Sequence, residues 1–108
     1  MTARIPLGAR VKVSRVFELP PKPGAGDHED DEMVEFAPVD NPKSEAVAIV
    51  IGVAIKATRL YVRSSYMGDQ EAVWWEPVPN FRRRFYVIRY TLTGRRRYTL
   101  PEFMEVLP

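Results

Sequence analysis

Two runs of three arginines, residues 82–84 and 95–97, are the side chains of this chain best suited to binding an acidic partner. A guanidinium group donates several hydrogen bonds in a planar fork, which matches carboxylates and phosphates. The two runs lie on either side of Thr93 and Gly94, a pair typical of a turn between strands. The spacing therefore predicts an arginine-rich hairpin near the end of the sequence.

Strand alternation divides each run between two faces. It places Arg82 and Arg84 on one face of the first arm. If the apolar residues of the second arm point to the core, Arg95 and Arg97 point outwards and join Arg89 across the hairpin. Like charges in such positions repel one another. We expect them to meet phosphate, an acidic peptide or the chain's own acidic loop, or to protect a sheet edge against aggregation.

The aromatic residues form a second candidate site. Trp74 and Trp75 are adjacent, so in a strand they face opposite ways. We expect Trp75 to join Val73 in the core and Trp74 to be at least partly exposed. An exposed Trp74 with Tyr61, Tyr66 or Tyr86 nearby would make a stacking platform or an aromatic cage. The alternative is a tryptophan that covers one end of the domain or a dimer contact.

Catalytic and metal-binding residues are scarce. The single histidine, His28, lies in the acidic run of residues 27–32, which lacks the spacing and the glycine of a calcium loop. No phosphate-binding glycine loop, nucleophile elbow or HExxH motif is present. We interpret the run as a solvated loop and expect no enzyme activity, no metal and no cofactor.

Length and composition indicate one small domain. The chain has 108 residues, of which 45% are hydrophobic, enough for one modest core. The absence of cysteine excludes disulfides and thiolate chemistry. No apolar run of membrane-spanning length and no secretory signal occurs, so we expect a cytoplasmic location and no membrane partner.

The net charge of +2 conceals a strong asymmetry. Residues 23–48 carry eight acidic groups and one basic group, whereas residues 77–108 carry seven basic groups and two acidic ones. Such a separation suits either a contact between molecules or an acidic loop lying over the basic face of its own domain.

Short β-rich segments separated by turn residues predict an all-β fold. Residues 18–44 are rich in proline and acid, and we expect a long mobile loop there. Within it, residues 33–39 could form a short edge strand that Pro38 ends. A single 3₁₀ turn is expected over residues 101–103, with Pro101 first. The expected strands span residues 8–17, 45–56 with a bend at Gly52, 59–65, 70–76, 81–92, 95–100 and, last, the segment near 104–107.

Three motifs occur in a characteristic order. They are GARVKV at residues 8–13, IGV at residues 51–53, and VIRYTLTG at residues 87–94 followed by LPEFMEVL at residues 100–107. This order resembles the Src-homology-3-like small barrel in its broad sense, which includes Tudor, chromo-barrel and KOW-type domains. The resemblance covers most of the chain except the acidic loop. It implies a single domain over residues 1–108, with five to seven strands and a binding role.

We therefore expect a non-catalytic module that engages a protein partner through arginine and aromatic residues. The alternatives are a nucleic-acid-binding barrel of KOW or Tudor type and a self-assembling phage structural component, and a homo-oligomer is compatible with each. In general style the chain resembles small accessory proteins of actinobacteria and their phages.

Overall fold

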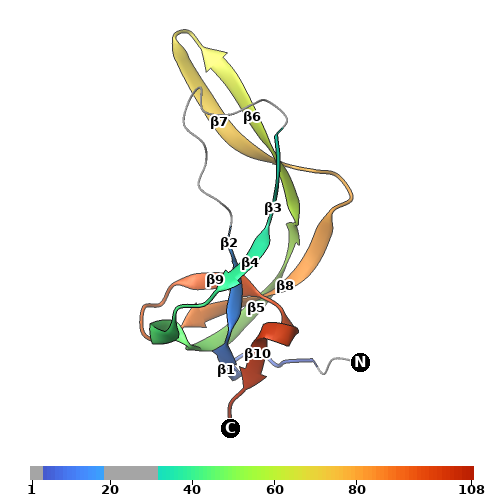
Figure 1. The fold of residues 1–108 in the computed structure, drawn as a ribbon. Coiled ribbons are helices and arrows are strands. Elements are labelled where there is room, and N and C mark those ends of the chain that lie inside the picture. Colours follow the sequence, from blue (N-terminus) through green and yellow to red (C-terminus); the bar gives the residue numbers. More distant parts are fainter. Residues whose placement is uncertain (1–3, 19–31) are drawn as a thin grey trace. The chain divides into compact units, whose positions relative to one another are not determined.

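A computed structural model describes residues 4–18 and 32–108, which form ten strands and two 3₁₀ turns (Figure 1). No α-helix occurs within these residues. The strands make two antiparallel sheets. The prediction of an all-β fold is therefore confirmed, whereas the expected five to seven strands are too few, because the segments around Ser14 and Phe36 each divide into two strands. His28 and most of the acidic run lie outside the described residues.

The larger sheet has seven strands and the smaller has three. In spatial order, the larger sheet contains β10 (Met104–Val106), β1 (Arg10–Val13), β5 (Val47–Ala57), β8 (Arg82–Tyr90), β9 (Arg96–Thr99), β2 (Arg15–Glu18) and β4 (Ala37–Asp40). The smaller sheet contains β3 (Met33–Glu35), β6 (Arg59–Met67) and β7 (Gln70–Pro77). The 3₁₀ turns are η1 (Lys43–Glu45) and η2 (Pro101–Phe103), and η2 has the bounds that the sequence predicted.

The described residues fall into two compact units. The first unit contains residues 4–18, 38–55 and 84–108, and the second contains residues 32–37 and 56–83. The core of the first unit is built from alternate residues of its strands, because a strand with one buried face buries every second side chain. Its members are Ile5, Val11, Val13, Val16, Ala48, Val50, Ile88 and Tyr90.

The predicted strand over residues 8–17 is wrong in one respect, because it is broken at Ser14. The Ser14 N–H donates to the Phe103 carbonyl at 2.9 Å, and the Ser14 carbonyl accepts from the Asn41 N–H at 3.0 Å. On either side of Ser14 the strands have different neighbours, because β1 pairs with β10 and β5 whereas β2 lies between β9 and β4. The sequence could not show this, since both partners lie far along the chain.

The predicted loop over residues 18–44 is also partly wrong. Residues 33–40 form β3 and β4, and η1 begins at Lys43. The short edge strand was expected, but Pro38 does not end it, because Pro38 lies inside β4. β4 is at the end of the seven-stranded order, where a residue without an N–H leaves no ladder bond unmade on its outer side.

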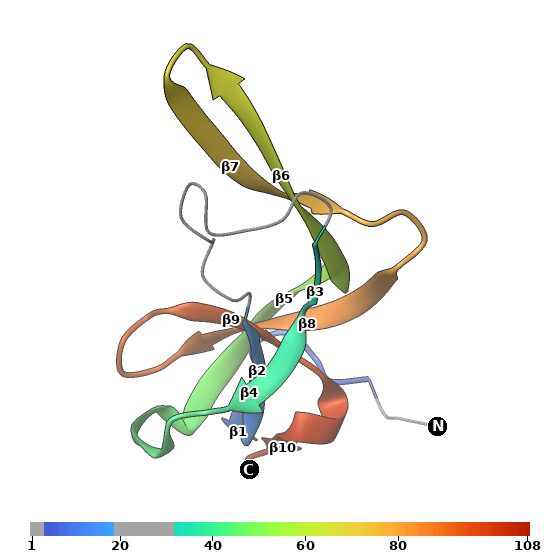
Figure 2. The ribbon, with the colours of Figure 1, turned by 45° about the horizontal axis from the view of Figure 1, so that its top comes forward.

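Strands β8 and β9 form the predicted hairpin (Figure 2). Gly94 adopts a positive φ of 74°, which glycine accepts at little cost. The Tyr90 N–H donates to the Arg95 carbonyl, and the Gly94 N–H donates to the Tyr90 carbonyl, both at 2.9 Å. These bonds end β8 at Tyr90, so Leu92 lies in the turn with 79% of its surface exposed rather than in the strand.

In the second unit, β6 and β7 pair from Leu60 and Pro77 to a tight turn at Gly68 and Asp69 (Figure 1). Leu60 and Val62 are buried, because alternate side chains of β6 point to the same face. Beside Val62, Trp75 lies on the same face but is only half-buried.

Candidate functional site

Two arginines of the β8–β9 hairpin face one another directly. The register pairs Arg89 with Arg96, and both side chains are exposed. Directly opposite residues of an antiparallel pair share a face, with Cβ atoms about 5 Å apart. The prediction that Arg89 meets Arg95 and Arg97 is therefore wrong. The loop of residues 91–94 sets the register one residue away from the one that the prediction needed.

A third arginine lies on this face. The Thr91 N–H donates to the Val47 carbonyl at 3.3 Å, which fixes the antiparallel register of β8 against β5. Because the strands are antiparallel, moving from Thr91 back to Arg89 on β8 corresponds to moving from Val47 forward to Ile49 on β5. Arg89 therefore lies beside Ile49. On the other side of β5, Arg10 pairs with Ile49 and is exposed. Arg10, Arg89 and Arg96 thus surround Ile49, and we call this surface of the first unit the arginine face.

None of these three arginines pairs with a carboxylate of the described residues. The ion pairs of the first unit join other arginines, Arg15 to Asp40 at 3.3 Å and Arg97 to Glu18 at 3.1 Å. The arginine face therefore presents three positive charges close together, which repel one another.

Aliphatic side chains run through the arginine face along β5. Ala48 and Val50 point into the core, so the alternate residues of β5 point the other way. Among these alternate residues, Val53 exposes 40% of its surface and Ile55 exposes 67%. The row comprises Val47, Ile49, Ile51, Val53 and Ile55. At its Val47 end, a hollow of about 310 Å³ opens between Arg10, η1 and Leu92.

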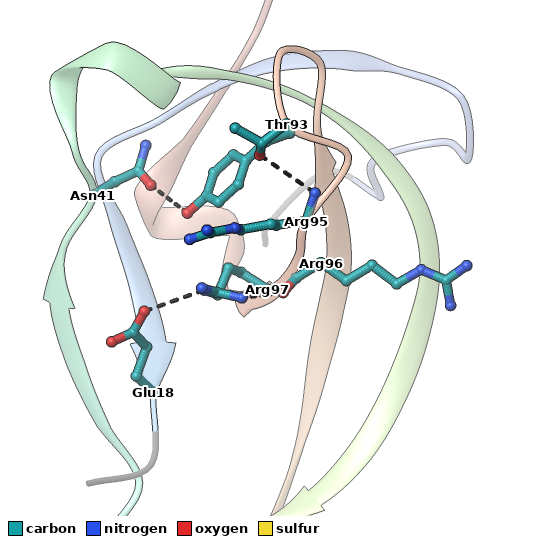
Figure 3. A network of polar contacts seen from close by, with 7 residues as sticks. Glu18, Asn41, Thr93, Arg95, Arg96 and Arg97 are labelled. Atoms are coloured by element: carbon teal, nitrogen blue, oxygen red, sulfur yellow. Dashed lines mark hydrogen bonds and ion pairs between the residues drawn. The ribbon is translucent and has the colours of Figure 1, made fainter. Parts of the chain in front are cut away.

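Arg97 lies on the opposite face and has a structural partner. In the hairpin register it pairs with the buried Ile88, and its Nε donates to Glu18 Oε1 at 3.1 Å. Figure 3 shows Arg95 and Arg97 extending toward the side of Glu18 and Asn41, whereas Arg96 extends away from it. Arg97 is thus neutralised by a carboxylate of β2.

Beside Arg97, the Tyr90 hydroxyl donates to Asn41 Oδ1. Burial raises the pKa of Tyr90 above its ordinary value. The charge of Arg97 acts in the opposite direction, while Glu45 and Glu18 add to the rise. The phenol therefore stays protonated at neutral pH and can donate this bond.

Tyr61 and Trp74 share a face of the three-stranded sheet, as an aromatic platform requires. Arg63 pairs with Trp74 across β6 and β7, and its guanidinium lies 5.0 Å from the centre of the Tyr61 ring. The same Arg63 is bound to Glu76 with an Nε–Oε2 distance of 2.6 Å. Of Trp74, 38% is exposed, which confirms the expectation of partial exposure. Because Arg63 is held by Glu76, this surface is aromatic rather than strongly basic.

The remaining predicted residues, Arg82 and Arg84, are both exposed on β8. Arg82 belongs to the second unit, where it lines a hollow of about 370 Å³ with Phe81 and Arg59. The guanidinium of Arg59 lies 4.2 Å from the centre of the Phe81 ring. Arg84 belongs to the first unit. By alternation it faces the side of Ile88, away from the arginine face.

Three residues that belong to the arginine face or to the contact of Tyr90 were not identified from the sequence. Arg10 and Arg96 complete the arginine face, and Asn41 accepts the hydrogen bond of Tyr90. The alternation of Arg10 with Val11 already indicated exposure, but not which strand would lie beside it.

Within residues 4–18 and 32–108, no three His, Asp or Glu side chains gather in a way that could hold a metal ion. The same residues contain no helix long and apolar enough to cross a membrane. No family model, no curated protein and no solved structure matches the chain.

Proposed function

We propose that the protein is a non-catalytic binding module whose arginine face holds a protein segment with both acidic and aliphatic side chains. The observation that carries the proposal is the direct pairing of Arg89 with Arg96 beside Arg10, with no carboxylate of the described residues as partner. Like charges at paired positions destabilise a sheet. A ligand that brings carboxylates to these guanidinium groups removes the repulsion and forms charge-assisted bidentate hydrogen bonds.

The aliphatic row of β5 favours a protein ligand over a nucleic acid. Interface cores are apolar and rich in arginine and aromatic residues. Single-stranded nucleic acids are instead held by aromatic side chains on which bases stack, together with phosphate contacts. The row from Val47 to Ile55 contains no aromatic residue. A peptide strand or helix that alternates carboxylates with Leu, Ile or Val matches this surface, because its carboxylates can bind the three arginines while its aliphatic side chains pack on the row of β5.

The proposed module is of the small-barrel kind that the sequence motifs resemble. The hairpin of β8 and β9, the η2 turn and the closing strand β10 support this proposal. β10 pairs with β1, so the last strand joins the first one of the chain.

Selection from a random peptide display library tests the ligand class. We expect the peptides retained by the wild-type protein to be enriched in Asp and Glu together with aliphatic residues. The double variant Arg89→Glu/Arg96→Glu should bind them at least 10-fold more weakly, because each lost charged hydrogen bond contributes about 1.5–3 kcal/mol.

Arg84→Glu/Arg95→Glu is the matched control, since it makes the same charge change at two exposed arginines of the same hairpin that lie on the opposite face. It should retain affinity within about threefold, well under the 1.4 kcal/mol that a tenfold loss represents. Peptides without acidic enrichment, or peptides that bind the double variant as tightly as the wild type, would contradict the proposal. Tight binding of random DNA or RNA, lost in the same double variant, would instead support the nucleic-acid alternative, with affinity falling steeply as salt rises.

A further inference from the structure

Strand β7 forms one end of the three-stranded sheet. It spans Gln70–Pro77 and pairs with β6 along its inner side. No strand of the described residues lies along its outer side. An edge of eight residues is long, and an unpaired strand edge is a template for pairing with another chain.

The ladder between β6 and β7 determines which backbone groups point outwards. The Val78 N–H donates to the Arg59 carbonyl at 3.0 Å, which in an antiparallel ladder brackets the non-hydrogen-bonded pair of Leu60 and Pro77. Hydrogen-bonded and non-hydrogen-bonded pairs alternate. The backbone N–H and C=O groups of Val73 and Trp75 therefore point away from β6, toward the outer edge.

The sequence of β7 offers little protection for this edge. Natural edge strands are commonly protected by lysine, proline, bulges or inward-pointing charges. β7 reads QEAVWWEP and contains no lysine or arginine, and its one proline lies at the end of the strand. Its centre, from Ala72 to Trp75, is apolar, so backbone pairing there would also bury side chains.

We propose that two copies of this chain pair through β7, antiparallel and centred on Val73, to give a continuous six-stranded sheet. This register places Val73 opposite Val73 of the second copy. It also places Trp74 opposite Ala72, Trp75 opposite Glu71, and Glu76 opposite Gln70 of the second copy. No like charges face one another, and the small Ala72 leaves room for the indole of Trp74, which is 38% exposed in the single chain.

The outer edge of β7 is complementary to itself in this register. A second copy of the chain is therefore the partner that we propose for it. A two-fold dimer uses one surface patch twice, so each pair of facing residues occurs twice. Here each of the three kinds of pair away from the axis joins a large residue to a small one or a charged residue to an uncharged one. The contact lies in the second unit and does not depend on the arginine face.

Disulfide trapping tests the register. The chain has no cysteine, so Val73→Cys introduces a single thiol. A hydrogen-bonded pair on the two-fold axis has Cα atoms about 5.5 Å apart, which is within the range for a disulfide. Gln70→Cys is the control, because in this register its two copies are about 20 Å apart along the strands. We expect Val73→Cys, and not Gln70→Cys, to form a covalent dimer under mild oxidation at micromolar concentration. Equal cross-linking of both variants, or of neither, would overturn the proposal.

Sedimentation equilibrium tests the association itself. Val73→Pro removes the outward N–H without removing a bond to β6, whereas Val73→Ala keeps that N–H. We expect the wild type and Val73→Ala to dimerise and Val73→Pro to do so at least 10-fold more weakly. Arg89→Glu/Arg96→Glu should dimerise like the wild type. A wild-type protein that stays monomeric up to about 1 mM, the concentration at which association is worth only about 4 kcal/mol, would overturn the proposal. The covalent test stays decisive if Val73→Pro does not fold.

Discussion

Tyr90 donates its phenolic hydrogen to Oδ1 of Asn41, and this bond holds the end of β8 against the segment that precedes η1 (Figure 3). The amide nitrogen of the same asparagine donates to the carbonyl oxygens of Val13 at 3.0 Å and Glu45 at 2.9 Å. One side chain thus joins β1, β8 and η1. A partly buried amide with all of these partners is costly to disturb, because a polar group left without its partner cannot recover it from water.

Tyr90→Phe should destabilise the fold by about 1–2 kcal/mol, because it removes the donor and leaves Asn41 Oδ1 without one. Urea denaturation followed by fluorescence would measure the change. Tyr61→Phe is the matched control, since it removes a hydroxyl from a half-buried ring of the second unit, and it should change stability by no more than about 0.5 kcal/mol. Equal effects of the two substitutions would contradict the role given to the Asn41 contact.

The raised pKa of Tyr90 predicts a loss of stability in alkali. Burial keeps the folded phenol neutral above pH 10, where the tyrosine of the unfolded chain ionises. The unfolded state then releases a proton that the folded state retains, so the free energy of unfolding falls as pH rises from about 10 to the folded pKa. The Tyr90→Phe variant has no phenolic proton to release at this position, so this contribution to the pH dependence is absent from it. The stability difference between wild type and variant should therefore narrow above pH 10, and a constant difference from pH 8 to pH 11 would contradict the assignment.

Thr99→Val should cost about 1 kcal/mol although it preserves side-chain volume. Thr99 is fully buried, and its Oγ1 donates to the Arg15 carbonyl at 2.7 Å, joining β9 to β2. Valine leaves that carbonyl without this donor. Thermal unfolding of the variant beside Thr93→Val would separate the loss of a buried hydroxyl bond from the loss of an exposed one, since the Thr93 hydroxyl only accepts a long bond of 3.4 Å from the Arg95 N–H in the turn. A Thr99→Val variant as stable as the wild type would show that the bond contributes nothing net.

Arg96→Glu should change the stability of the fold and the binding of acidic peptides in opposite directions. It replaces a like-charge pair with a cross-strand Arg89–Glu pair, so we expect stability to rise by about 0.2–1 kcal/mol while binding of acidic peptides is lost. Added salt should stabilise the wild type more than the variant, because it screens the repulsion between the two arginines as the Debye length falls from about 10 Å at 0.1 M to about 3 Å at 1 M. Arg84→Glu should show neither effect. A fall in stability of Arg96→Glu would mean that the two guanidinium groups are not in repulsive contact.

Local patterns in the sequence were sufficient for most strand positions. The strand that begins at Arg59, the turn at Gly94 and the proline that begins η2 are all properties of a few adjacent residues, and the structure confirms them. The same local reasoning predicted that Trp74 would be partly exposed. Periodicity and turn chemistry depend on neighbours in the chain, which is why they can be read from it.

What the sequence could not determine is which strands lie side by side. The interruption at Ser14, the continuation of β4 through Pro38 and the meeting of Arg10 with Arg89 and Arg96 each depend on partners far along the chain. The sequence alone indicated an all-β chain whose last third is rich in arginine. Only the tertiary structure decided which arginines share a face, because a shift of one residue in register moves every side chain to the other side of the sheet.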